Sequence, residues 1–392
     1  MQKKIIALAI AAAISAPAFA DNANITFYGK VDVSNDFVNT GDGTTKANGT
    51  IAVVGTNKRV VSSNVSKFGF KGSEDLGNGL AAVWQVEQLV NIDDSSNSCA
   101  AVTAADATAT GVPACTANNG LFATRNTFAG LKSDSFGTVL LGRHDTPYKL
   151  ATRSLDVFGD NIGDNRSLMG NKSYASFELR STDVLAYISP AFAGVTVAVA
   201  TVNLSEANTV GSTAANSALS AAAMYSAAPF YGSVAYESHT LSSLGTATIV
   251  APVESAARVG FGFKPEGFEL NVVYESTSDN LGVANDNKYG HTAYYVGGKV
   301  ELFGSDAVKV AYGSVSETGS ATNLVANSGA TQISVGYDHG LSKRTKVYAL
   351  YTRIANGAGA NYKFSQNSGA ASTTSGYGTS PTVLSLGLQH NF

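Results

Sequence analysis

Apolar and polar positions alternate along much of this chain in short runs. In residues 25–38, one set of alternate positions is apolar or Gly and the other set is mostly polar. Because successive side chains of a β-strand point to opposite faces, this pattern predicts a strand with one apolar and one polar face. Residues 383–392 show the same alternation, with Leu384, Leu386 and Leu388 on one face. An antiparallel sheet in a soluble protein can alternate in the same way, so the period alone leaves both interpretations open.

The runs are joined by two kinds of connection, and sixteen strands are expected. Short links rich in Gly, Pro, Asn and Asp alternate with long loops rich in Gly, Asn, Ser and Ala, such as 91–120, 145–172 and 356–380. The expected strands are residues 25–38, 60–72, 80–90, 121–132, 137–144, 183–189, 195–202, 218–227, 233–239, 255–264, 268–276, 292–302, 307–315, 331–339, 346–354 and the terminal run to 392. An even strand number with this alternation of links is typical of bacterial outer-membrane barrels, and sixteen strands leave an aqueous lumen. The predicted fold class is all-β, a 16-stranded antiparallel transmembrane β-barrel.

The N-terminal segment has the pattern of an export signal. Lys3 and Lys4 precede an apolar run at 5–14, and Ala18 and Ala20 fit the small-residue rule for cleavage. We therefore expect a signal peptide at 1–20 and one barrel domain at 21–392. The apolar run is too short for a membrane-spanning helix, and no later stretch is long enough for one.

Composition favours a barrel over a multidomain soluble protein. The chain has 40 Gly, 17 Tyr and 18 Phe among 392 residues, only 14% charged residues, and few helical patterns. Removing two of the 26 basic groups with the signal peptide leaves 24 against 29 acidic groups, a formal charge of −5. This mild acidity argues against nucleic acid as a partner, since nucleic-acid binding calls for a basic face.

Several motifs in a fixed order resemble one family. They are 66–80 (SKFGFKGSEDLGNGL), 128–132 (FAGLK), 142–149 (GRHDTPYK), 341–345 (LSKRT) and the terminal strand. Together they resemble the Gram-negative general diffusion porins, the neisserial and burkholderial type especially. The resemblance implies a homotrimer in the outer membrane, in contact with lipid and lipopolysaccharide, whose third extracellular loop folds inward. Ser385, Gly387, His390 and Phe392 also resemble the terminal signal read by the outer-membrane assembly machinery, with His390 where Tyr or Phe is commoner.

The expected function is passive diffusion of ions and small hydrophilic solutes through a water-filled channel with no cofactor. A substrate-specific channel and a surface adhesin or structural barrel are the alternatives. An enzyme is not expected, because the five histidines are scattered and no nucleophile elbow or phosphate loop is present.

A diffusion pore selects by the charges that line its narrowest point. Strand parity places Lys30, Lys67 and Lys71 on the inward face, whereas Arg125, Arg143 and Arg180 lie in or beside motifs of the resembled family. The expected constriction residues are Lys30, Lys67, Lys71, Arg125, Arg143, Arg180, Asp145, Asp156 and Asp160. Acidic groups on the 145–172 loop would face these basic groups and set up a transverse field, although any one loop aspartate can also be an ordinary solvated residue. Ala186 stands where the resembled motif usually carries Arg, so only a weak anion preference is expected.

Cys99 and Cys115 lie in the second long loop. An exported protein meets oxidising conditions, so we expect a disulfide that contributes about 3 kcal/mol. A reactive or metal-binding pair is the alternative, but no Cys/His spacing resembles a zinc site.

Overall fold

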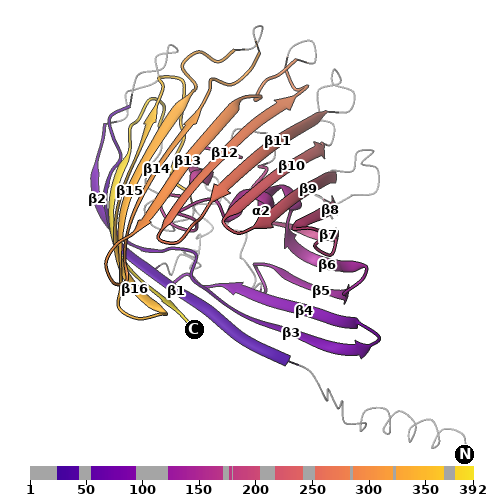
Figure 1. Ribbon diagram of the computed structural model, residues 1–392. Helices are drawn as coiled ribbons and strands as arrows, with labels where there is room; N and C mark the ends of the chain where they lie inside the picture. Colours follow the sequence, from indigo (N-terminus) through magenta and orange to yellow (C-terminus); the bar gives the residue numbers. More distant parts are fainter. Residues whose placement is uncertain are drawn as a thin grey trace, which may run out of the picture.

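The computed structural model describes residues 24–43, 54–93, 122–170, 176–178, 180–203, 217–241, 252–282, 286–320, 324–365 and 376–392. Within them the chain forms one continuous antiparallel sheet that closes into a barrel (Figure 1). The expected signal peptide and the Cys99–Cys115 pair lie outside the described residues, so both stay predictions. Among the described residues, no helix is long and apolar enough to cross a membrane.

From β3 to β17 each strand pairs with its neighbour in sequence, β2 and β3 both pair with β1, and β1 also pairs with β17 to close the ring. The strands are β1 Asn24–Asn39, β2 Asn57–Ser63, β3 Lys67–Gly77, β4 Leu80–Leu89, β5 Thr127–Ser133, β6 Gly137–Asp145, β7 Arg180–Ile188, β8 Val195–Asn203, β9 Ser217–Ala227, β10 Phe230–Thr240, β11 Val253–Phe263, β12 Phe268–Asp279, β13 Thr292–Glu301, β14 Asp306–Val315, β15 Ala330–Gly340, β16 Thr345–Asn356 and β17 Thr382–Asn391. This closure confirms the expected all-β barrel.

The seventeen segments make sixteen barrel strands, because β2 and β3 pair one after the other with the same strand, β1. The prediction of an uninterrupted strand at 60–72 is wrong in this detail. Val65 takes a positive φ of 54°, which breaks the ladder. Ser66 Oγ accepts a hydrogen bond from the Asp32 amide and donates one to the Asp32 carbonyl, both at 3.0 Å. The break therefore leaves the facing backbone of β1 satisfied.

The two faces of the sheet differ as the alternation predicts. On β17, Leu384, Leu386 and Leu388 are exposed on the outside, whereas Val383 and Ser385 are fully buried. Similar rows of exposed apolar side chains cover the outside of most strands. An outer surface of this kind suits lipid, because a closed ladder also pairs the backbone polar groups of its strands with one another.

Phe392 sits at the seam of the barrel. Its amide donates to the Gly29 carbonyl at 3.1 Å, and the Gly29 amide donates to the Phe392 carbonyl at 3.0 Å. The Phe392 ring lies 5.4 Å from the Phe27 ring, centroid to centroid. A Cβ at residue 29 would lie 2.3 Å from that ring and 2.8 Å from the Lys67 carbonyl oxygen, so only Gly fits there without a shift.

The segment between β6 and β7 folds into the lumen. It contains a short helix, α2 (Pro147–Arg153), and a single 3₁₀ turn, η1 (Asn165–Ser167). Pro147 begins the helix at the position where its fixed φ and missing amide cost nothing. The helix packs against the inner face of β8 to β11 (Figure 1). The loop thus lines one side of the barrel and leaves the wall of β1 and β3 to β7 facing it.

Candidate pore constriction

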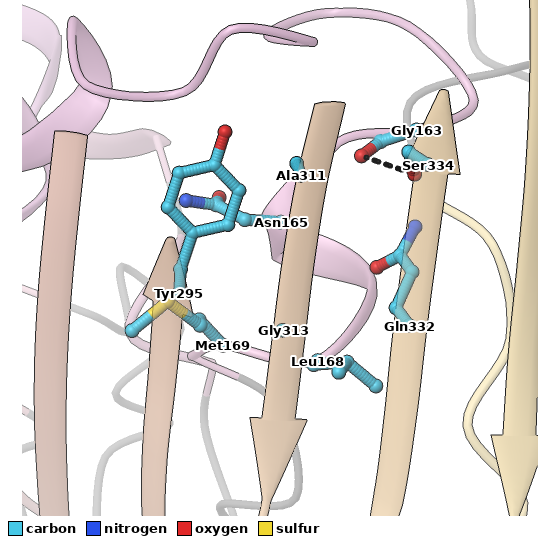
Figure 2. A pocket seen from close by; sticks show the side chains of 9 residues that line it. All are labelled: Gly163, Asn165, Leu168, Met169, Tyr295, Ala311, Gly313, Gln332 and Ser334. Atoms are coloured by element: carbon cyan, nitrogen blue, oxygen red, sulfur yellow. Dashed lines mark hydrogen bonds between the residues drawn. The ribbon is translucent and has the colours of Figure 1, made fainter. Parts of the chain in front are cut away.

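Apolar packing holds the inward loop against the wall of β13 to β15. Leu168 and Met169 are buried here beside Tyr295, and the Ser334 hydroxyl donates to the Gly163 carbonyl at 3.5 Å (Figure 2). Phe158 is also buried, with the Lys309 ammonium 4.9 Å from its ring centroid. These contacts fix the part of the loop from Phe158 to Met169, which follows the helix in the chain.

Salt bridges within the loop hold its shape. We call Arg153, Asp156, Asp160, Asp164 and Arg166 the loop cluster. The side chain of Asp164 is fully buried, and its carboxylate accepts hydrogen bonds from Arg153 and Arg166, each at 2.7 Å. Asp160 pairs with Arg166 at 2.8 Å and with Arg153 at 3.3 Å, and Asp156 lies 3.5 Å from Arg153. The carboxylates of Asp156, Asp160 and Asp164 thus pair with only two arginines, Arg153 and Arg166, and these ion pairs fix the turn between α2 and η1.

A second group of charges anchors the loop to β11 and β12. Arg258 forms ion pairs with Glu275 and, at 2.6 Å, with Glu178 of the loop. The Tyr148 hydroxyl of α2 donates to Glu275 at 2.7 Å, and the Gly170 amide donates to it at 2.8 Å. All of these charged groups are buried or nearly so and have partners, as burial of charge requires. Sequence reasoning missed this anchor because its strands are far from the loop in the chain.

The facing wall carries cations that share carboxylates. Glu87 on β4 accepts from Arg125 at 2.5 Å, lies 3.8 Å from the Lys67 ammonium and accepts the Tyr28 hydroxyl at 3.0 Å. On β1, Lys30 lies 3.6 Å from Asp32. Sequence reasoning missed Glu87, although its parity with Gln85 on strand β4 places it inward and could have identified it.

Arg180 and Lys149 share the remaining wall carboxylate. Arg180, at the start of β7, lies 3.0 Å from Asp145, and Lys149 of α2 lies 2.9 Å from it. Arg180 also donates to the Asn126 side chain at 2.6 Å. Asp145 therefore lies on the wall, at its corner with the loop, where it pairs with two cations and balances one of their two charges.

The cations on the facing wall are more exposed to the lumen than the carboxylates they pair with. The side chain of Lys67 is 23% exposed against 7% for Glu87, and that of Lys30 is 12% exposed against 3% for Asp32. Arg125 and Arg180 are likewise more exposed than their partners. The four wall cations share three carboxylates, Asp32, Glu87 and Asp145, which leaves one formal positive charge. Because a passing ion interacts with the nearest and least screened charge, the more exposed cations make this wall a positive surface.

Asp160 is the loop carboxylate that opposes this wall. Its side chain is 24% exposed, whereas those of Asp156 and Asp164 are fully buried. Burial alone would raise the pKa of the Asp160 carboxyl, but nearby cations outweigh burial and hold its pKa well below the usual range. Those cations are Arg153, Lys30, Arg166 and Lys67. Two of them belong to β1 and β3, so loop and wall interact electrostatically across the gap.

Comparison with known proteins decides the family. The family model described as Gram-negative porin matches residues 7–359, most of the chain. The chain belongs to the Gram-negative porin family. Outer membrane porin protein 32 of Delftia acidovorans is 26% identical to this porin over the full length of both chains. Major outer membrane protein P.IB of Neisseria meningitidis is 33% identical over 50% of this porin and 47% of its own length.

Solved structures show the same fold. An anion-selective porin from Comamonas acidovorans superposes with a TM-score of 0.72 at 21% identity, covering 95% of this porin and all of that chain. OmpT of Vibrio cholerae gives a TM-score of 0.61 at 13% identity, and the superposition covers 94% of this porin and 98% of that chain. The protein is therefore an outer-membrane porin of a Gram-negative bacterium, a barrel that forms a channel.

The porin does not bring every predicted constriction residue together. Asp156 lies behind the loop, where it accepts a hydrogen bond from Tyr295 at 3.1 Å. Lys71 is on the inner face of β3 but nearer the short turn, opposite Thr26 of β1. Arg143 shares the strand parity of Val139 and Leu141, which are exposed on the outside. Ala186 is buried and brings no charge.

Within the described part of the porin, no group of three or more His, Cys, Asp or Glu side chains is arranged to hold a metal ion. The charged groups of the constriction pair with one another instead. Paired charges of alternating sign along a wall suit the passage of solvated ions.

Proposed function

We propose that this porin passes ions and small hydrophilic solutes passively, with a weak preference for anions, and that it catalyses no reaction. The proposed constriction is formed by Lys30, Lys67, Arg125 and Arg180 on the wall and Asp160 on the loop. The observation that carries the preference is the exposure of the wall cations in front of their buried carboxylates. Asp160 opposes it with a single negative charge, so the preference is weak.

The related structures support this proposal. The solved porin from Comamonas acidovorans is described as anion-selective, and its superposition covers 95% of this chain. The OmpT structures of Vibrio cholerae include a trimer form. We propose that this porin is also a homotrimer, surrounded by lipid and lipopolysaccharide and inserted by the outer-membrane assembly machinery. We further propose that residues 1–20 are a signal peptide and 21–392 a single barrel domain.

Planar bilayers under a KCl gradient test the constriction. The double variant Lys67→Gln with Arg125→Gln should move the reversal potential towards the potassium equilibrium potential, because it uncovers the negative charge of Glu87. The matched control is Lys343→Gln with Arg344→Gln, which removes the same two charges in the short turn between β15 and β16 and should leave selectivity unchanged. An unchanged reversal potential in the first variant would remove both residues from the filter. Absence of discrete conductance steps in the wild type would reject the channel itself.

A further inference from the structure

A cavity of about 440 Å³ lies on the inner wall below the constriction, at the ends of β3 to β7 that lead into short turns. The periplasm is the side of the short turns in such barrels. The cavity has the size of a small-molecule site. Its titratable lining groups are Lys71, Lys132 and His144, and no Asp or Glu of the described residues lines it.

The two lysines differ from the cations of the constriction. Lys30, Lys67, Arg125 and Arg180 each have a carboxylate within 4.0 Å. Neither Lys71 nor Lys132 pairs with a carboxylate among the described residues, and both are exposed. Lys71 instead lies 5.5 Å from the Tyr28 ring centroid. The cavity therefore carries net positive charge that the protein itself leaves uncompensated.

Between the two lysines the wall is mostly apolar, with Gln85 as a polar residue beside Lys71. Lys71 of β3 pairs with Gln85 of β4, and Gln85 pairs with Phe128 of β5. Lys132 lies four residues after Phe128 on β5 and pairs with Thr138 of β6. By strand geometry the two lysine Cα atoms are roughly 16 Å apart. Phe128, Leu140 and Ile188 line the cavity around that stretch. Gly130 pairs with Leu140 in the middle of it, and a Cβ at residue 130 would lie 2.3 Å from the Val139 carbonyl oxygen.

We propose that this cavity binds amphipathic organic monoanions, carboxylates with an aliphatic chain, on the periplasmic side of the constriction. The carboxylate would pair with the ammonium of Lys71 or Lys132, and the chain would lie on the partly buried side chains of Phe128 and Ile188. Small inorganic anions have no apolar chain to bury on this stretch, so they do not bind there. The inference rests on the channel function proposed above.

Octanoate and acetate, added to the short-turn side of the reconstituted wild-type channel, test the proposal through block of the KCl current. Octanoate should block at a much lower concentration than acetate, since each methylene buried on the apolar stretch strengthens binding by at most about fourfold. Lys71→Gln and Lys132→Gln should each weaken octanoate block by about threefold, the scale of an exposed ion pair. Ile188→Thr keeps a β-branched residue in the strand and should weaken octanoate block while leaving acetate unchanged.

Two controls separate the possible failures. Lys264→Gln removes an exposed lysine at the same end of the barrel but outside the cavity, and should leave the block unchanged. Two double variants locate the blocking anion: Lys71→Gln with Lys132→Gln, and Lys67→Gln with Arg125→Gln. If octanoate still blocks the first variant but no longer blocks the second, the anion binds at the constriction and the proposal is overturned. Equal block by octanoate and acetate in a conducting, ion-selective channel would also overturn it and leave the channel function intact. A protein with no conductance would reject the channel function and this site with it.

Discussion

At the scale of residues, selectivity depends on which member of each ion pair is exposed. Strand parity in the sequence could predict that Lys30 and Lys67 point inward, because a strand alternates strictly. It could not predict that Glu87 pairs with both Lys67 and Arg125, since this depends on the register of β3 against β4 and on the path of the segment before β5. Nor could it separate Asp160 from the buried Asp156, because both belong to an irregular loop with no period to place their side chains.

Asp160→Asn should strengthen the anion preference. Asp160 is the exposed carboxylate of the loop cluster and has a positive φ of 64°, a conformation that Asn tolerates well. Removing one charge at close range should raise the chloride-to-potassium permeability ratio by about twofold, measured as a reversal potential in a KCl gradient. Asp306→Asn, at the exposed start of β14, is the matched control. Equal ratios for Asp160→Asn and the wild type would mean that Asp160 does not face the ion path.

At the scale of elements, the inward loop is fixed by buried charge as well as by apolar packing. The long link at 145–172 could be predicted from composition, and Pro147 marks the start of α2. The packing of the loop could not be predicted, because its contacts form only once the barrel has closed. These contacts join Tyr148 and Glu178 of the loop to Arg258 and Glu275 of the wall. The break between β2 and β3 was also hidden, since a single positive φ at Val65 leaves no mark on the alternation.

Asp164→Asn should loosen the loop without unfolding the barrel. Asp164 is fully buried and pairs with Arg153 and Arg166, so its loss leaves buried positive charge and costs the packed loop about 3 kcal/mol. We expect frequent closures and variable conductance in single-channel recordings, whereas the mobility shift on heating stays that of the wild type. Asp134→Asn, in the exposed turn between β5 and β6, should record like the wild type. Steady wild-type conductance in Asp164→Asn would show that apolar packing alone holds the loop.

At the scale of the whole molecule, closure of the barrel brings the C-terminal residue against the first strand. The alternation of 383–392 predicts the last strand and its outer face, and the resemblance of the last residues to an assembly signal singles out Phe392. That Phe392 lies over Gly29 could not be read from the sequence, because the contact depends on how far β17 is shifted along β1.

Deleting Phe392 should block assembly, and Gly29→Ala should impair it in the same way. A Cβ at residue 29 would meet both the Phe392 ring and the Lys67 carbonyl oxygen, so the seam could not close without a shift. Gly232→Ala is the control, because a Cβ there meets no atom within 4 Å. The measurement is the yield of heat-modifiable oligomer in outer-membrane fractions. Normal yield from the truncated chain would show that the terminal residue is dispensable.

The central claim is that exposed wall cations outweigh the net negative charge of the chain. The most direct test is the zero-current potential of the wild-type channel in a tenfold KCl gradient at neutral pH. A modest displacement from zero towards the chloride equilibrium potential is the predicted result. A displacement towards the potassium equilibrium potential would show that Asp160 and the outer loops, and not the cations of β1, β3 and β7, control the passage of ions.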